Sequence, residues 1–256
     1  MRSYAPAHAG LAEAYLKSQQ FKEGYWELGE SVRLDPNNVE ARNNYAALSL
    51  AAERYDEVLE QSDAIIALDP KHFSAWVLRS QALSKLDRAE EAEQSLLKAV
   101  EIEPDKASLQ ILLAMHYEQR LRLADAEAAY RKSAAMEPSA LAWTGLGRLL
   151  FADPKRDAET EEIFKKAIEV ARSEQAAGKE KSYLAGTWQN LASFYFQRQR
   201  PAEGVAALES GIEESETKLD LIYQLARYLR RQGENEKADA LMQRATEVSP
   251  GSAEPH

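Results

Sequence analysis

Small and large apolar residues follow one another along this chain at places that recur every 34 residues. When residues 5–38, 39–72, 73–106 and 107–140 are aligned, positions 8, 20 and 27 of each segment hold mostly small residues, with larger apolar residues between them. Position 8, for example, holds Ala12, Ala46, Ser80 and Ala114. Small residues at fixed places let two helices approach closely while bulky neighbours fill the remaining space. The pattern therefore predicts a pair of packed helices in each segment.

Prolines mark the end of each segment. Position 32 holds Pro36, Pro70, Pro104 and Pro138, and Pro250 joins the series once a longer fifth segment is allowed. Proline cannot continue a helix interior, so it should end the second helix, and the acidic residue before it favours a turn. A fixed period of this size is typical of a stacked array of repeats and not of a globular enzyme core.

The fifth segment is longer than the others. Trp143 and Trp188 restate the opening of a segment 45 residues apart instead of 34. We expect its second helix to run on toward Gly178, a residue suited to ending a helix, within a polar insertion at residues 173–182. The last three segments are then residues 141–184, 185–218 and 219–252.

These residues resemble the tetratricopeptide repeat family, whose pattern has Trp at position 4, Tyr at 11 and Pro at 32. Trp76 stands at position 4, and Tyr15 and Tyr117 stand at position 11. The resemblance implies an all-α fold, a right-handed α-solenoid (superhelix) of about seven helix-turn-helix hairpins. Residues 1–256 would form a single array, with the first helix of each hairpin on the concave side.

Neither end of the sequence is typical of the polar capping helix that usually closes such an array. Residues 1–4 are too few, and residues 249–256 contain Pro250, Gly251 and Pro255. This favours a fragment of a longer protein, or terminal hairpins that associate with a partner or with another copy.

The composition argues against several classes of function. The net charge of −10 disfavours nucleic acid as a partner, and the lack of cysteine excludes disulfides and cysteine-based zinc sites. The four histidines are too far apart in sequence for a metal-binding pair, and neither a phosphate-binding glycine loop nor a nucleophile elbow is found. We predict no enzyme activity, no catalytic residues, no cofactor and no metal.

No apolar signal segment or membrane-spanning run occurs, so we expect a soluble protein, cytoplasmic or periplasmic, without direct membrane insertion. Two acidic clusters, one around Glu91 and one around Glu161, are expected on solvated outer faces.

The resemblance also implies which residues line the concave groove, because positions 2, 5, 6, 9 and 12 of first helices point into it. Their character changes from amide to apolar to basic along the chain. The candidate binding residues are Asn43, Asn44, Val77, Leu78, Ile111, Leu112, Met115, Arg148, Gln189, Asn190, Tyr223, Gln224, Arg227 and Arg230, with Arg231 adjoining.

Two parts of this groove have competing interpretations. The apolar middle suits the side chains of a bound peptide, or it packs between adjacent first helices. Arg227, Arg230 and Arg231 share one helical face and could hold an acidic segment or a chain terminus. Alternatively, these arginines are solvated or paired with Glu234 and Glu236.

One known binding mode of the family can be tested by residue. Members that bind chaperones hold a terminal carboxylate with a clamp of lysine, asparagine and arginine side chains. Asn44 matches the central asparagine of that clamp, but Ala9, Glu13, Ser74 and Leu78 stand where its other residues should be. The clamp is therefore not present in the first three segments.

The leading hypothesis is a non-catalytic scaffold that binds a peptide or protein segment in its concave groove. Bacterial secretion, exopolysaccharide or envelope assembly is a setting suggested by analogy. One alternative is a regulatory or targeting arm of a larger enzyme such as a glycosyltransferase. Another is a self-assembling array that associates through its ends.

Overall fold

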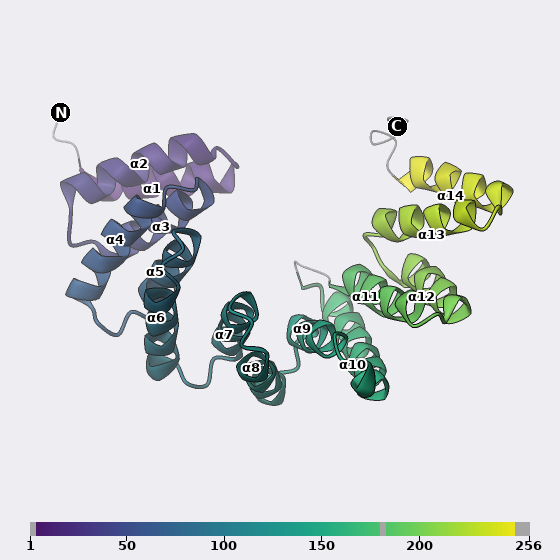
Figure 1. The fold of residues 1–256 in the computed structure, drawn as a ribbon. Helices are drawn as coiled ribbons and strands as arrows, with labels where there is room; N and C mark the ends of the chain where they lie inside the picture. The colour runs from purple at the N-terminus through teal and green to yellow at the C-terminus, as the bar shows by residue number, and fades with distance from the viewer. Residues whose placement is uncertain (1–3, 180–182, 249–256) are drawn as a thin grey trace. The chain divides into compact units, whose positions relative to one another are not determined.

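The computed structural model describes residues 4–179 and 183–248, which are α-helical apart from short connections. The expected termini without caps, the expected turn at Pro250 and part of the polar insertion lie outside these residues. Fourteen α-helices follow one another in the described residues, so the prediction of an all-α repeat fold is confirmed (Figure 1). None of these helices combines the length and the apolarity needed to cross a bilayer.

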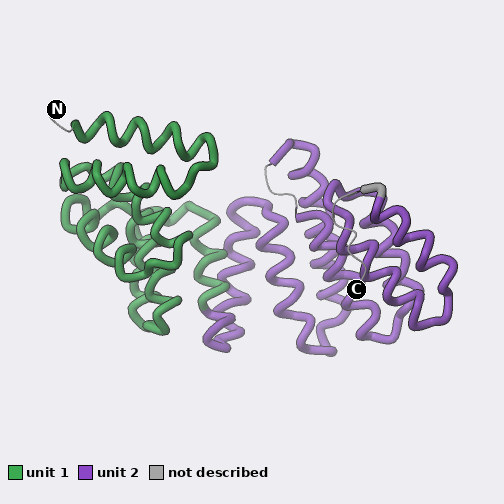
Figure 2. The backbone as a smooth tube through the Cα atoms, turned by 90° about the horizontal axis from the view of Figure 1, so that it is seen from above, with its two compact units in different colours: residues 1–116 green, residues 117–256 purple. Residues whose placement is uncertain are grey.

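The helices group into two compact units (Figure 2). Unit 1 comprises residues 1–116 and unit 2 residues 117–256, so that the boundary falls within α7 (Ala107–Gln119). The helices before α7 are α1 (Ala5–Lys17), α2 (Phe21–Leu34), α3 (Val39–Ala51), α4 (Tyr55–Leu68), α5 (Phe73–Lys85) and α6 (Ala89–Ile102). Those after it are α8 (Leu123–Met136), α9 (Ala140–Leu150), α10 (Asp157–Ala176), α11 (Leu184–Gln197), α12 (Pro201–Glu214), α13 (Leu219–Arg231) and α14 (Asn235–Val248).

First helices end in the same way in most hairpins. The residue at position 15 adopts a left-handed backbone conformation in Gln19, Glu53, Asp87, Leu121, Gln199 and Gly233. The next amide then donates to the carbonyl five residues back, as from Arg54 N to Ser49 O at 2.8 Å. This arrangement satisfies helix-end carbonyls and reverses the chain toward the second helix.

In the first four hairpins, the second helix ends directly before the acidic residue that precedes the proline, as predicted. α2 ends at Leu34 before Asp35 and Pro36, and α4 ends at Leu68 before Asp69 and Pro70. The Asp69 carboxylate accepts a hydrogen bond of 3.0 Å from the Lys71 amide, which closes the turn.

The fifth hairpin is lengthened in its second helix, α10, which has 20 residues where the other second helices have 14. A short 3-10 helix, η1 (Pro154–Arg156), takes the place of the usual turn after α9. α10 ends at Ala176, and Gly178 follows with φ of +68°, in agreement with its expected role as a helix stop.

Close packing in the hairpins depends on the small residues. Ala46, Ala92 and Ala126 are fully buried. In unit 2, Phe164, Leu184, Leu191, Phe194 and Leu208 form one continuous core with the apolar residues of α13 and α14. A side chain at Gly147 would begin 2.6 Å from the Phe164 ring, so the α9–α10 contact requires glycine there.

An arginine stands at the start of five second helices and pairs with a carboxylate three residues later. The pairs are Arg54–Glu57, Arg88–Glu91, Arg122–Asp125, Arg156–Glu159 and Arg200–Glu203. Some also reach the preceding hairpin, as in the bond from Arg200 to Glu161 at 2.6 Å. The expected solvated position is therefore wrong for Glu161, which also accepts from the Tyr195 hydroxyl at 3.0 Å, whereas its neighbour Glu162 is exposed.

Candidate functional site

The candidate site is a groove in unit 2 between the first helices α11 and α13. It encloses about 650 Å³ and is lined by Phe196, Gln199, Pro201, Gln224, Arg227, Tyr228, Arg231 and Gln232. Phe196 belongs to α11, Gln199 to the turn after it, and Pro201 is the first residue of α12. The remaining residues belong to α13, except Gln232, which follows it directly. The groove thus combines two cations, two aromatic rings and three amide side chains.

The aromatic side chains of Phe196 and Tyr228 pack together and form one wall of the groove. The rings of Phe196 and Tyr228 have centroids 4.6 Å apart with an interplanar angle of 31°. Behind them, a side chain at Gly204 would begin 2.7 Å from the Phe196 ring, so α12 supports that ring directly. Because Phe196 is held by both Tyr228 and α12, it loses little conformational entropy when a ligand packs against it.

The arginines divide between two faces of α13. Arg227 and Arg231, one turn apart, are exposed and line the groove. Among the described residues, neither forms an ion pair. Arg230 instead binds Asp239 of α14 at 3.0 Å and does not line the groove. The expectation that all three arginines act together needs this correction.

The ion pairs that the sequence suggests for the arginines of α13 also differ from those in the structure. Of the two expected partners of these arginines, Glu234 pairs instead with Lys237 at 2.5 Å, and Glu236 forms no ion pair with them in the described residues. α14 therefore provides a partner for Arg230 while leaving Arg227 and Arg231 available to a ligand.

Gln224 is one of the residues that line the groove. Its Nε2 atom is 3.5 Å from the Ser193 hydroxyl on α11. Its Oε1 atom is buried and has no hydrogen-bond partner in the described part of the chain.

The remaining basic and amide candidates in unit 2 lie outside this groove. Arg148 is 3.5 Å from Glu118, and the Asn190 side chain donates to the Gly186 carbonyl at 2.7 Å within α11. Gln189 is exposed, whereas Tyr223 is half-buried against the unit 2 core. The structure therefore brings Gln224, Arg227 and Arg231 together but not these four residues.

In unit 1 the candidate apolar residues separate by burial. Leu78 and Ile111 are each only 7% exposed, and Leu78 packs with Ala46, Val58 and Ala82. For these two residues the packing interpretation is correct, and they are not available to a ligand. Val77 and Leu112 are half-buried, and Met115 is 43% exposed.

The two asparagines of unit 1 have different roles. Asn43 accepts a hydrogen bond of 2.9 Å from the Ser74 hydroxyl and so ties α3 to α5. Asn44 lines a smaller hollow of about 250 Å³ between α1 and α3, together with Gly10, Glu13 and Leu16. This hollow carries no cation, so it offers less to a charged ligand than the α11–α13 groove.

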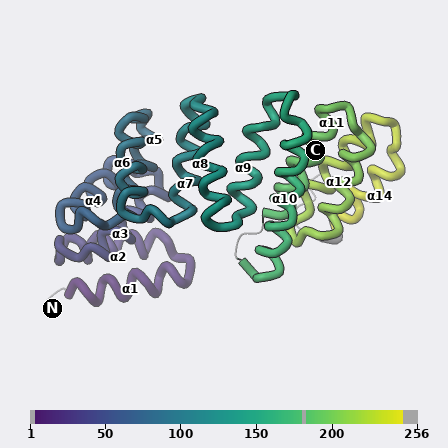
Figure 3. The backbone as a smooth tube through the Cα atoms, turned by 90° about the horizontal axis from the view of Figure 1, so that it is seen from below, coloured from purple at the N-terminus to yellow at the C-terminus, as the bar shows by residue number. Residues whose placement is uncertain are grey.

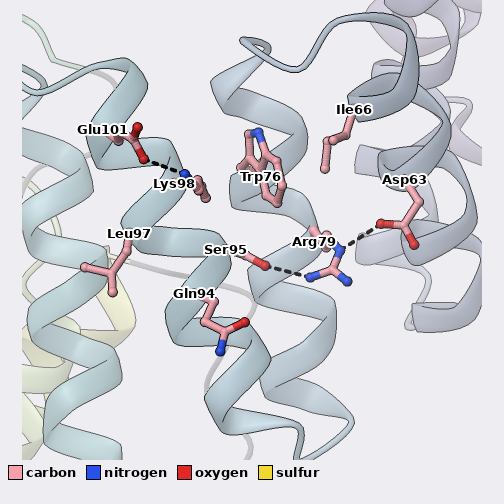
Figure 4. A pocket seen from close by; sticks show the side chains of 9 residues that line it. All are labelled: Asp63, Ile66, Trp76, Arg79, Gln94, Ser95, Leu97, Lys98 and Glu101. Atoms are coloured by element: carbon pink, nitrogen blue, oxygen red, sulfur yellow. Dashed lines mark hydrogen bonds and ion pairs between the residues drawn. The ribbon is translucent and has the colours of Figure 1, made fainter.

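A further hollow in unit 1, of about 580 Å³, lies between the second helices α4 and α6, over α5 (Figure 4). Its charged groups are already paired, Arg79 with Asp63 and Lys98 with Glu101, both at 2.7 Å. Trp76 forms one side and donates from Nε1 to the Pro70 carbonyl at 3.0 Å. Sequence reasoning missed this hollow, although Trp76 and Trp188 at position 4 were a signal for it.

No group of three or more His, Cys, Asp or Glu side chains in residues 4–179 and 183–248 is placed to hold a metal ion. His72 caps the N-terminus of α5 and accepts a hydrogen bond from the Ala75 amide at 3.3 Å. His8 binds Glu27 at 2.5 Å. These two histidines thus have structural contacts in the described hairpins.

Comparison with protein families identifies the repeat. Models described as tetratricopeptide repeat match residues 73–106, 111–178 and 219–252, which together make up just over half of the chain. The chain belongs to the tetratricopeptide repeat family. The match at residues 219–252 includes α13, so the candidate groove is partly built from a recognised tetratricopeptide repeat.

Solved structures show the same fold. A tetratricopeptide repeat protein from Parabacteroides merdae aligns over 97% of this chain and 94% of its own, with a TM-score of 0.66 and 17% identity. The APC/C hetero-tetramer Cut9-Hcn1 aligns over 98% of this chain and 47% of that chain, with a TM-score of 0.63 and 17% identity. MamA from Desulfovibrio magneticus RS-1 covers 66% of this chain and 96% of its own, with a TM-score of 0.59 and 22% identity.

A curated relative is similar over a short stretch. Trafficking protein particle complex subunit 12 of Mus musculus is 31% identical over 89 residues, which are 33% of this chain and 11% of that protein. This chain thus matches only about a tenth of that relative's length. Together, the comparisons establish a helical repeat fold of a kind used for protein interaction.

Proposed function

We propose that the protein is a non-catalytic scaffold that binds an acidic peptide segment of a partner protein in the α11–α13 groove. The observation that carries this proposal is the exposed pair Arg227 and Arg231, which lacks carboxylate partners among the described residues. Most other arginines in the described part of the chain pair with acidic side chains. Two unpaired cations on one wall of a groove, in a chain of net charge −10, favour an anionic ligand.

The rest of the groove narrows the ligand class. Arginine forms bidentate hydrogen bonds with carboxylates, so aspartate, glutamate or a chain terminus fits Arg227 and Arg231. Phe196 and Tyr228 offer an apolar surface for a neighbouring side chain. A short acidic peptide with one bulky apolar residue supplies both groups.

The experiment compares two variants in which the same kind of residue is removed. A fluorescent 12-residue peptide rich in Asp and Glu, with one Leu, is titrated against wild type, against Arg227→Gln with Arg231→Gln, and against Arg230→Gln. We expect the double variant to bind at least about tenfold more weakly, because two charge-assisted hydrogen bonds are lost. Arg230→Gln should bind nearly as wild type, because Arg230 faces Asp239.

The salt dependence supplies an independent check. Attraction between exposed charges weakens as ionic strength rises, so wild-type affinity should fall from 50 to 300 mM NaCl and that of the double variant should change much less. Equal affinities for wild type and double variant at low salt would contradict the proposal.

A further inference from the structure

The hollow of about 580 Å³ between α4 and α6, named here the α4–α6 hollow, has an apolar lining. Ile66 of α4, Trp76 of α5 and Leu97 of α6 contribute to it (Figure 4). α5 packs against both α4 and α6 within unit 1 (Figure 3). Leu97 is 45% exposed, and Ile66 and Trp76 are half-buried. A space of this size has room for one or two long side chains of a partner.

The sixth hairpin shows what can cover a tryptophan at this position. Trp188 stands at position 4, as Trp76 does in the third hairpin, and it lines the corresponding hollow between α10 and α12. Arg172 of α10 lines the same hollow, and its guanidinium carbon lies 5.5 Å from the centroid of the Trp188 ring. A cation over an aromatic face is attracted by the electrons of the ring. In this hairpin the chain itself supplies the cation.

Trp76 lacks such a cation because α4 is shorter than α10. Arg172 lies in the part of α10 that exceeds the usual 14 residues of a second helix, whereas α4 ends at Leu68. Among the described residues, no cation lies over the Trp76 ring. The two cations that line the α4–α6 hollow are engaged elsewhere, Arg79 by Asp63 and Ser95 and Lys98 by Glu101. The Trp76 ring is therefore available to a cation from a partner.

The charge around the α4–α6 hollow favours a basic partner. α4, α5 and α6 contain eight carboxylates but only three basic side chains. Asp56, Glu60 and Asp63 follow one another along α4 at one-turn spacing, and all three are exposed. Only Asp63 of this row forms an ion pair in the described residues, since the nearby Arg88 is bound to Glu91 at 2.7 Å. Complementary charge would direct basic side chains to this face.

We propose that the α4–α6 hollow is a second binding site, which holds an arginine from a basic segment of a partner protein over the Trp76 ring. Arginine fits better than lysine, because its planar guanidinium stacks on aromatic faces and is more weakly hydrated. The apolar stem of the arginine and a neighbouring apolar side chain contact Ile66 and Leu97. The hydrogen bond from Trp76 Nε1 to the Pro70 carbonyl, at 3.0 Å, holds the indole in place. This site is separate from the α11–α13 groove and takes a ligand of opposite charge.

The test titrates two labelled peptides and follows their fluorescence anisotropy in 50 mM NaCl. One peptide of 12 residues contains three Arg and one Leu, and its counterpart has Gln in place of Arg. Wild type should bind the arginine peptide at least about tenfold more tightly than the glutamine peptide. Trp76→Leu should weaken binding of the arginine peptide about three- to tenfold, whereas Trp76→Phe should retain most of the affinity because a phenyl ring also attracts a cation. Far-UV circular dichroism confirms that each variant keeps its helices.

A second pair of variants separates this site from general attraction to an acidic protein. Asp56→Asn with Glu60→Gln should weaken binding of the arginine peptide about three- to tenfold, because it removes the row of charge beside the hollow. Glu209→Gln with Glu213→Gln is the matched control, since it removes two exposed carboxylates one turn apart on α12. The control should bind nearly as wild type. Equal weakening by the two pairs would overturn the proposal.

Nuclear magnetic resonance locates the contact. The chain has four tryptophans, so an amide spectrum of the ¹⁵N-labelled protein contains four indole signals, and the signal absent from Trp76→Phe identifies Trp76. Addition of the arginine peptide should shift the Trp76 signal and leave the other three nearly in place. The proposal fails if wild type does not bind the arginine peptide up to 1 mM, if Trp76→Leu binds as wild type, or if binding leaves the Trp76 signal unmoved.

Discussion

Glu127 shows how single charges connect hairpins in this protein. Arg156 donates to both of its carboxylate oxygens, at 2.6 and 2.7 Å, and Arg131 lies 2.9 Å away. Hydrogen bonds from Arg156 are the main cause that lowers the Glu127 pKa to about 2, although partial burial acts in the opposite direction. The ordinary value is 4.5, so the folded state holds this carboxylate ionised far more strongly than the unfolded chain does.

The pH dependence follows from that difference. Since the folded pKa is depressed, the stabilisation from Glu127 is complete above about pH 4.5 and is lost as the pH falls toward 2. Glu127→Gln should therefore lower the free energy of unfolding by about 1–2 kcal/mol at pH 7 and by much less near pH 2.5. Urea unfolding of both proteins at several pH values measures this. A difference that is the same at pH 7 and pH 2.5 would contradict the account.

Leu121 is a second residue whose conformation can be tested. It adopts φ of +57° at the end of α7 and is 81% exposed, so it combines backbone strain with little packing. Gly233 occupies the equivalent position after α13 without strain. We expect Leu121→Gly to raise the free energy of unfolding by about 0.5–1 kcal/mol.

Gly233→Ala is the matched change in the opposite direction and should lower stability by a similar amount. Thermal unfolding of both variants checks the pair. A Leu121→Gly variant that is less stable than wild type would show that the left-handed turn is not strained.

At the scale of the element, the hairpins depend on small residues where two helices meet. Gly147 of α9 faces the Phe164 ring, and Gly145 faces Tyr130. Gly10 in α1 has open space around its α-carbon. Glycine therefore allows close helix contact in α9, whereas in α1 it has no packing role.

These glycines should respond oppositely to alanine. Gly147→Ala places a methyl group 2.6 Å from a buried ring and should lower the free energy of unfolding by about 1–3 kcal/mol. Gly10→Ala raises the helix propensity without a clash and should raise the free energy of unfolding by about 0.5–1 kcal/mol. Chemical unfolding of each single variant measures both changes. A neutral Gly147→Ala would mean that α9 and α10 separate easily.

The sequence predicts the helical elements well because their signals are local and periodic. Pro36 and its counterparts cannot be accommodated in a helix interior, and Ala46 or Ala126 must be small wherever two helices touch. The direction of individual side chains is harder to predict from the sequence. Arg227, Arg230 and Arg231 share one face by spacing, yet Asp239 on the next helix withdraws Arg230 from it. Such pairing depends on a neighbour that periodicity does not place.

Burial also escapes prediction from position alone. Leu78 and Arg227 both occupy positions expected to face the groove, but Leu78 fills a space left by Ala46 and Ala82. The acidic cluster around Glu161 shows the same limit, because Arg200 comes from the following hairpin. The repeat defines where a residue stands, and neighbouring side chains decide whether it meets solvent, core or a charge.

At the scale of the whole molecule, an acidic tetratricopeptide repeat protein carries two distinct surfaces. The α11–α13 groove is basic and aromatic, whereas the α4–α6 hollow has an apolar lining and lies among acidic helices.

The most direct test of the central claim is a charge reversal in the groove. Isothermal titration calorimetry measures the binding of an acidic 12-residue peptide and of its Gln and Asn counterpart to wild type, to Arg227→Glu with Arg231→Glu, and to Arg230→Glu. We predict that wild type and Arg230→Glu prefer the acidic peptide, and that the double reversal abolishes this preference. If the double reversal retains the preference, or if Arg230→Glu loses it equally, the α11–α13 groove is not the binding site.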